Sequence, residues 1–377
     1  MLNCRLFLVV ATALVGTLGL VACGSDEQAS GDVPSGGTGG GSTDAAAESA
    51  QPDATGATGG VGGTGEDAGT PEDATVNEDG GQDADASVAK PEEPRFDQVA
   101  SYSTTIAASG DPTDVYHPNP ADLGTGSYAF PIALMMQGAK VDKQHYASFA
   151  RIVASYGFVV VVPNHESMSV TGQGLYMQPS VVNDVLGHMQ AEQQSHPVLG
   201  GKLDLSTLVL LGHSYGGVVA MQALQGVCQF PFCIGGFNRP AELKAGALFA
   251  TNMKPPFGAI PETDNTGWAI ALVQGDQDQK AKLADTVETY EKIKAPPKAL
   301  VTLAGVNHYG ICDTNNPPGA DADTGAATTD QATAVETAAR WSALFLRAHV
   351  LGDTEAASYV HQTGDASDPV ATVVSAP

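Results

Sequence analysis

The stretch LVLLGHSYGG, residues 208–217, places one serine between an apolar run and a pair of glycines. It contains the pattern G-x-S-x-G over residues 212–216, which can mark Ser214 as a catalytic nucleophile. The chain has 44 glycines among 377 residues, so the pattern can also arise by chance. The segments on either side of the pattern have to decide between these two interpretations.

Ser214 falls where a buried strand is expected to become a helix. The run 206–212 (STLVLLG) is short and apolar, and 214–226 (SYGGVVAMQALQG) predicts a helix that ends at its last glycine. A tight turn between them exposes the Ser214 hydroxyl at the carboxyl edge of the sheet. The same turn directs the backbone N–H of Tyr215 towards an oxyanion that forms there. This context favours the catalytic interpretation.

Strands and helices alternate along the rest of the chain. Apolar runs predict further buried strands at 132–136, 158–162, 245–250, 268–275 and 298–305. Helical patterns predict helices over 142–157, 180–194, 281–293 and 332–351. Continuous apolar strands separated by helices are typical of a sheet covered on both faces. The predicted fold class is therefore α/β, with a doubly wound, mostly parallel sheet.

A nucleophilic serine needs a base, and the base needs an orienting carboxylate. Three histidines, His308, His349 and His361, lie beyond the later strands. His349 falls in the last predicted helix and His361 in a polar tail. His308 follows the strand 298–305, at the edge where the base must lie. We therefore predict His308 as the base, the alternative being an ordinary loop histidine.

Asp276 and Asp278 follow the strand 268–275 at the same edge, and either could orient the histidine. Together, GHSYGG, GDQDQ and NHYGICD resemble the α/β-hydrolase superfamily over residues 110–351. In that family a G-D-x-D loop usually contributes its second aspartate. The resemblance therefore implies Asp278 as the acid and Asp276 as a turn former.

The resemblance also implies a second oxyanion donor in the loop after the strand 132–136. The family commonly has His-Gly there, whereas this chain has Gln137 and Gly138. Because the donor is a backbone N–H, this departure need not abolish function. We expect the N–H groups of Ala139 and Tyr215 to form the oxyanion hole.

Three segments, DVYHPNP, ASYGFVVVVPNHES and NHYGICD, are similar to the group of chlorophyllases, platelet-activating-factor acetylhydrolases and cutinase-like polyester hydrolases. These are serine hydrolases of carboxylic esters, so the resemblance implies an ester substrate and no metal or other cofactor. The same triad also permits a peptidase or an acyltransferase. A non-catalytic binding lipoprotein on a hydrolase scaffold is the alternative from another class.

The segment 251–267 connects two predicted strands and contains three prolines. It is too short for a helical cap, so we expect an α/β-hydrolase fold without a large lid. An open site suits bulky or polymeric esters. Met168, Tyr176, Met177 and Phe257 are candidates for an acyl cleft, with ordinary packing as the alternative.

The amino terminus has the features of an export signal. One arginine precedes an apolar run that is short for a membrane span. The run ends in Leu-Val-Ala before Cys23, which resembles the lipobox of bacterial lipoproteins. That resemblance implies a signal peptide over 1–22, a lipid on Cys23 and, with Gly24 as the next residue, an outer-membrane address. The alternatives are an ordinary secretory signal and an uncleaved anchor.

Residues 23–94 are rich in glycine, alanine and threonine and have almost no large apolar side chains. Residues 24–94 carry 16 acids and one base, and we predict a disordered acidic tether. The catalytic domain is expected over 95–377, which contains 26 acidic and 15 basic residues. This balance argues against nucleic-acid binding, which needs a basic surface. No obligatory protein partner is inferred.

Three cysteines remain in the domain: Cys228, Cys233 and Cys312. The helix that begins at Ser214 is expected to end about 18 Å away, near the opposite edge of the sheet. Cys228 and Cys233 would lie there, whereas Cys312 is close to His308. We therefore predict a Cys228–Cys233 disulfide and a free Cys312. A bridge to Cys312 would require the 228–233 loop to fold back.

Overall fold

The computed structural model describes residues 90–119 and 128–377. The predicted signal peptide, Cys23 and nearly all of the predicted tether 23–94 lie outside these ranges. Within them, no helix combines the length and the apolar character that crossing a membrane requires.

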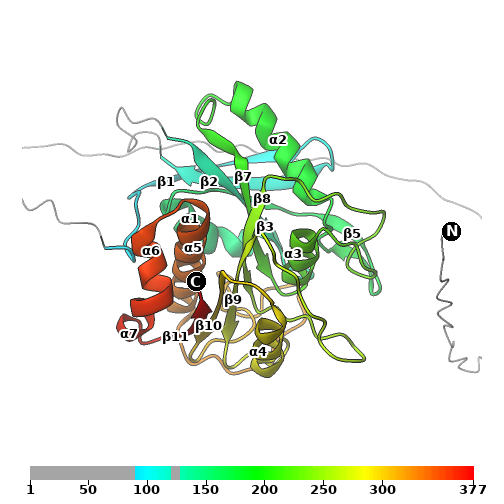
Figure 1. The fold of residues 1–377 in the computed structure, drawn as a ribbon. Coiled ribbons are helices and arrows are strands. Elements are labelled where there is room, and N and C mark those ends of the chain that lie inside the picture. The colour runs from blue at the N-terminus through cyan, green and yellow to red at the C-terminus, as the bar shows by residue number, and fades with distance from the viewer. Residues whose placement is uncertain (1–89, 120–127) are drawn as a thin grey trace, which may run out of the picture. The chain divides into compact units, whose positions relative to one another are not determined.

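A nine-stranded mixed sheet forms the centre of the described chain, in the order β1-β2-β4-β3-β7-β8-β9-β10-β11 (Figure 1). The six strands from β4 to β10 in this order are parallel to one another. At one side β1 and β2 are antiparallel, and at the other β11 is antiparallel to β10. The strands are β1 (Val99–Ile106), β2 (Asp111–Pro118), β3 (Phe130–Met136), β4 (Val159–Pro163), β7 (Leu203–His213), β8 (Leu243–Phe249), β9 (Ala269–Gly275), β10 (Lys298–Leu303) and β11 (Ala371–Ala376).

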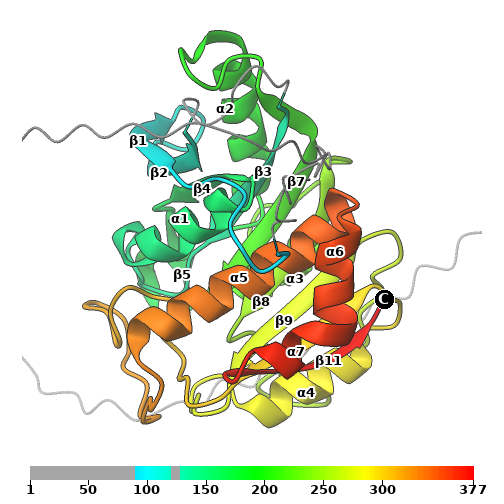
Figure 2. The same ribbon diagram turned by 90° about the vertical axis from the view of Figure 1, so that its left-hand side faces the viewer.

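Helices cover both faces of the sheet (Figures 1 and 2). One face packs against α1 (Ala147–Ser155) and α5 (Gln331–Val350). The other packs against α2 (Val181–Ser195), α3 (Tyr215–Gln225) and α4 (Leu283–Lys292). Short elements complete the chain: the 3-10 helix η2 (Lys143–Tyr146), α6 (Thr354–Ser358), the π-helical turn η3 (Tyr359–Thr363) and α7 (Gly364–Ser367).

The side chains of β3 show how an apolar run serves two cores. Ala133 and Met135 join the core on the α1 and α5 face, whereas Ile132, Leu134 and Met136 join the core on the opposite face. Successive side chains of a strand point to opposite faces, so a strand buried on both sides is apolar throughout. The six parallel strands are the six predicted from such runs. The predicted α/β class is confirmed, and the sheet is consistent with an α/β-hydrolase fold.

Several elements were not predicted. β1 and β11 are edge strands with alternating exposure, and they lack the continuous apolar run of the central strands. The Gly-rich loop after β4 contains a hairpin of β5 (Glu166–Ser169) and β6 (Gly172–Leu175). The predicted helix 142–157 is divided into η2 and α1, and the predicted polar tail forms α6, η3, α7 and β11. The segment 251–267 contains no helix, as expected.

Candidate active site

Ser214 occupies the sharp turn between β7 and α3. Its φ of 52° and ψ of −120° lie in a region that residues with a side chain rarely adopt. Gly216 permits the close approach that this turn requires, because a Cβ there would lie 2.2 Å from the carbonyl oxygen of Met136 at the end of β3. The turn therefore places Ser214 at the carboxyl edge of the sheet, beside the loop that follows β3.

His308 lies within hydrogen-bond distance of Ser214. Its Nε2 is 2.8 Å from Ser214 Oγ, and its Nδ1 is 2.8 Å from Asp278 Oδ2. Because a carboxylate only accepts hydrogen bonds, Nδ1 carries the proton. In the neutral imidazole Nε2 is then an acceptor, and it faces the serine hydroxyl. The structure thus brings together the three residues predicted from their order in the chain.

Asp278 is held by donors on both of its oxygens. Oδ1 accepts hydrogen bonds of 2.8 Å from the N–H groups of Lys280 and Ala281, and Oδ2 accepts one of 3.1 Å from Gln274 Nε2. Asp276 has a different role, because its Oδ1 accepts a hydrogen bond of 2.8 Å from Gly305 N. His308 is therefore paired with Asp278, and Asp276 joins the loop after β9 to the loop after β10.

Gln274 was missed in the sequence. It is fully buried in β9, and its Oε1 accepts a hydrogen bond of 2.9 Å from Thr286 Oγ1 in α4. The amide is thereby fixed so that Nε2 reaches Asp278. A lone amide inside the apolar run ALVQG was the available signal, because a buried polar side chain needs partners.

The histidine loop, residues 306–312, is supported from the segment before α5. Asp323 Oδ2 accepts a hydrogen bond of 2.9 Å from His308 N. Asp323 Oδ1 accepts from the N–H groups of Gln279 and Gly325, at 3.2 and 3.0 Å. Asp323 thus joins the loop that carries the histidine to the loop that carries the acid. The sequence around Asp323 has no apolar pattern from which this role could be predicted.

The two predicted oxyanion donors flank Ser214. The oxyanion loop, residues 137–140, follows β3, and Ala139 and Ser214 line the same small hollow, together with His308. Tyr215 is the first residue of α3, so its N–H has no hydrogen-bond acceptor within the helix. Both N–H groups therefore belong to backbone next to the serine, as the sequence led us to expect.

The hollow at Ser214 is small, about 250 Å³ including the solvent at its mouth. None of the four predicted cleft residues lines it. Met168 in β5 and Phe257 in the segment 251–267 are exposed, with 56% and 94% of their surface accessible, and Met177 is in the core. Tyr176 packs its ring against Tyr215, with ring centroids 5.4 Å apart. The structure therefore brings none of the four into the hollow, and Met177 follows the alternative of ordinary packing.

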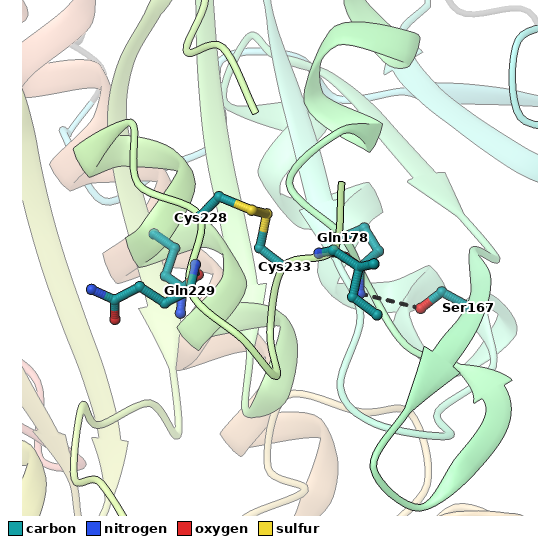
Figure 3. The surroundings of a disulfide bond; sticks show 7 residues. Ser167, Gln178, Cys228, Gln229 and Cys233 are labelled. Carbon is teal, nitrogen blue, oxygen red and sulfur yellow. Dashed lines mark hydrogen bonds between the residues drawn. A yellow bond between two sulfur atoms is a disulfide. The ribbon is translucent and has the colours of Figure 1, made fainter. Parts of the chain in front are cut away.

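The structure contains the predicted disulfide between Cys228 and Cys233 (Figure 3). The disulfide loop, residues 227–234, does not stay at the far end of α3, however. Phe232 contacts the ring of Tyr215 at 5.1 Å, and Ile234 N donates a hydrogen bond of 3.0 Å to Gln178 Oε1. The loop folds back beside α3 and covers the residue after the serine. Burial there raises the pKa of Tyr215 to about 12.

Cys312 is free and buried, as predicted. It lies in the core on the α1 and α5 face, whereas Tyr215 and Phe232 pack on the core of the opposite face. The sheet separates Cys312 from the disulfide loop, which explains why folding back does not lead to a bond between them. Among the described residues, no group of three or more His, Cys, Asp and Glu side chains could hold a metal ion.

Residues 98–233 match the family model of the chlorophyllases. The match runs from β1 to the disulfide loop and covers just over a third of the 377 residues. It includes Ser214 and both oxyanion positions, and it ends before Asp278 and His308. This similarity suggests ester hydrolase activity. No curated protein matches the chain.

Proposed function

We propose that the protein is a serine hydrolase of carboxylic esters that acts through an acyl-enzyme. The observation that carries this proposal is the continuous series of hydrogen bonds from Ser214 through His308 to Asp278. Such a series supplies a nucleophile, a base in the correct tautomer and a carboxylate that stabilises the imidazolium. The similarity of residues 98–233 to the chlorophyllases supports an ester as the substrate.

In the acylation step, Ser214 Oγ attacks the carbonyl carbon of the ester while His308 Nε2 takes the hydroxyl proton. The carbonyl oxygen becomes an oxyanion and accepts hydrogen bonds from the N–H groups of Ala139 and Tyr215. The tetrahedral intermediate then expels the alkoxide, which leaves as an alcohol with the proton from His308. An acyl ester on Ser214 remains, and Asp278 stabilises the charged imidazole during these steps.

In the deacylation step, water takes the place of the alcohol. His308 Nε2 removes a proton from the water, and the hydroxide oxygen attacks the acyl carbon. The second tetrahedral intermediate expels Ser214 Oγ, which recovers its proton from His308. The carboxylic acid is released, and Ser214 and His308 are back in their starting protonation states.

An ester panel tests this proposal. We expect the full chain to hydrolyse esters, and Ser214→Ala to lose about 10⁴-fold or more in kcat with unchanged thermal unfolding. Ser206→Ala, which removes an exposed hydroxyl that donates to Asp204, is the matched control and should keep its activity. Full activity of Ser214→Ala would contradict the proposal. Adding an acceptor alcohol or a peptide substrate to the panel separates an acyltransferase or a peptidase.

The segment 251–267 contains no helix, and this supports bulky or polymeric esters as substrates. Met253 N in the segment 251–267 donates to Thr289 Oγ1 of α4, which holds part of this segment against the helix. The panel therefore extends from short soluble esters to long-chain and polymeric ones. Hydrolysis restricted to the shortest esters would reject the open-site interpretation while leaving the triad intact.

We propose that the enzyme is tethered to the cell envelope by a lipid on Cys23, with an outer-membrane address. The apolar run ending at this cysteine supports the anchor. After expression in a bacterial host, the protein should partition into detergent and Cys23→Ser should partition into the aqueous phase. Equal partitioning of the two proteins would reject the anchor, and fractionation of the two membranes tests the address.

A further inference from the structure

A tyrosine and a histidine lie buried beneath the loops of the candidate active site. Tyr146 at the end of η2 and His213 at the end of β7 are both fully buried. His213 Nδ1 is 2.9 Å from the Tyr146 hydroxyl, and His213 Nε2 is 2.9 Å from the carbonyl oxygen of His308. The Tyr146 hydroxyl also accepts a hydrogen bond of 2.8 Å from Gly138 N. The pair therefore contacts the oxyanion loop, the turn at Ser214 and the histidine loop.

The direction of each hydrogen bond in this cluster can be assigned. The His308 carbonyl only accepts, so His213 Nε2 carries the proton. In the neutral ring Nδ1 is then an acceptor, and Tyr146 donates to it. Burial, followed by the neighbouring His308, holds the pKa of His213 well below its ordinary value, so the ring stays neutral. Burial raises the pKa of Tyr146, so the hydroxyl keeps the proton that it donates.

Cys312 and Gly138 make further contacts with this pair. The Cys312 thiol interacts with the Tyr146 hydroxyl, and burial raises the pKa of this thiol, so it stays protonated. Gly138 packs directly on the histidine, because a Cβ at this position would lie 2.6 Å from His213 Nδ1. The oxyanion loop is thus held against Tyr146 by a hydrogen bond and against His213 by close packing.

We propose that Tyr146 and His213 are positioning residues, which set the distance between the oxyanion loop and Ser214. The proposal rests on the proposed function. The two oxyanion donors, Ala139 N and Tyr215 N, belong to different elements, and both must lie about 2.7–3.1 Å from the same oxygen in the transition state. Gly138 adjoins the first donor, and His213 belongs to the turn that carries the second. The hydrogen bond from His213 Nε2 to the His308 carbonyl oxygen also fixes the position of the base relative to both donors.

Tyr146→Phe removes only the shared hydroxyl and leaves the ring in place. Removing one oxyanion donor costs about 10²–10³ in kcat, and a displaced donor should cost less, about 10–100-fold. Because the loss is confined to the transition state, KM for a short soluble ester should stay within about threefold. His213→Gln should show a similar loss, and the double variant should lose no more than the larger single loss if the two residues act as a unit.

Tyr156→Phe is the matched control. Tyr156 follows α1 at the end of the helix away from Tyr146, and its hydroxyl donates a hydrogen bond of 2.5 Å to the carbonyl oxygen of Glu92. This variant also loses a hydroxyl that is hydrogen-bonded within the fold, so it measures how much the loss of any such hydroxyl lowers the stability of the protein. Its kcat should stay within about twofold of the parent. An equal fall in kcat for Tyr146→Phe and Tyr156→Phe would overturn the positioning role.

A measurement without substrate tests the cluster itself. In the full chain labelled with ¹⁵N-histidine, His213 should give the signals of a neutral ring protonated at Nε2 at pH 6.5, where an ordinary histidine is half protonated. Tyr146→Phe should shift the Nδ1 signal, and Tyr156→Phe should not. A ring protonated at Nδ1 or at both nitrogens would overturn the assignment.

The parent chain in the same ester assay separates the two proposals. An inactive parent would overturn the proposed function and, with it, the role in catalysis. An active parent in which Tyr146→Phe keeps its full kcat would overturn the positioning role alone.

Discussion

The two edges of the sheet differ in whether their polar side chains are fully paired with one another. A larger cavity, about 1190 Å³ with its solvent, lies at the amino edge, where the parallel strands begin, and is lined by Phe96, Arg347 and Asp353 among others. The hollow at Ser214 on the carboxyl edge is about 250 Å³. At the amino edge Arg347 and Asp353 satisfy each other, whereas at the carboxyl edge a series of hydrogen bonds ends on an accessible hydroxyl. The chemistry of the lining groups, not the volume, identifies the candidate site.

The largest expected effect separates the two aspartates of the carboxyl edge. Asp278→Asn should lower kcat about 10³–10⁴-fold, because an amide no longer holds His308 in the required tautomer. Asp276→Asn keeps an oxygen that can accept from Gly305 N, so its kcat should stay within about threefold. Steady-state kinetics on a short ester measure both. Equal losses in the two variants would contradict the pairing of His308 with Asp278.

A change at the amino edge should affect stability and not activity. Arg347 is 8% exposed, and it donates to the Asp353 carboxylate and to the carbonyl oxygen of Tyr156. Burial alone would raise the pKa of Asp353, but the N–H of Ala356 and the Arg347 guanidinium hold it below its ordinary value.

Arg347→Met removes the buried ion pair with this carboxylate and should cost about 3 kcal/mol of unfolding free energy. Urea unfolding measures the loss, and kcat of the folded fraction should stay unchanged. A variant that unfolds normally but loses its turnover would show that the two edges are coupled, contrary to the comparison.

The smallest expected effect is a pH dependence of stability at the amino edge. His349 Nε2 lies 3.0 Å from His361 Nε2, and burial followed by His361 lowers the pKa of His349 to about 4. Because the unfolded chain takes up this proton near pH 6.5 and the folded chain does not, the unfolded state binds more protons between these values. The contribution is present above about pH 6.5 and is lost as the pH falls towards 4.

Comparing urea midpoints at about pH 5 and pH 8 tests this effect. After allowance for solvent screening, His349→Gln should reduce the difference in unfolding free energy by on the order of 1 kcal/mol. The activity at pH 8 should be unaffected, because neither histidine contacts the carboxyl edge. An unchanged difference between the two pH values would contradict the shifted pKa.

The sequence was sufficient where one local pattern determined one element. The run before Ser214 is apolar because β7 is buried on both faces, so strand, turn and helix could be read together. The order of the later strands placed His308 and Asp278 at the same edge. β11 could not be predicted in this way, because an edge strand with half-exposed side chains has no continuous apolar run.

Roles that depend on contacts between distant segments were not predicted. Tyr146 lies within the predicted helix 142–157, and only the fold shows that its hydroxyl reaches Gly138 and His213. Gln274 and Asp323 hold the acid and the histidine through loops that meet only in three dimensions. The disulfide was predicted from the length of the helix after Ser214, but the return of its loop to Tyr215 depends on packing between aromatic rings.

The most direct test of the central claim is the reaction of the full chain with a fluorophosphonate, followed by mass spectrometry of its peptides. Such a probe reacts with a serine that is activated by its base. The account predicts a single adduct on Ser214 that disappears in His308→Ala. A folded protein that forms no adduct, or an adduct that persists in His308→Ala, would contradict the claim that Ser214 is an activated nucleophile.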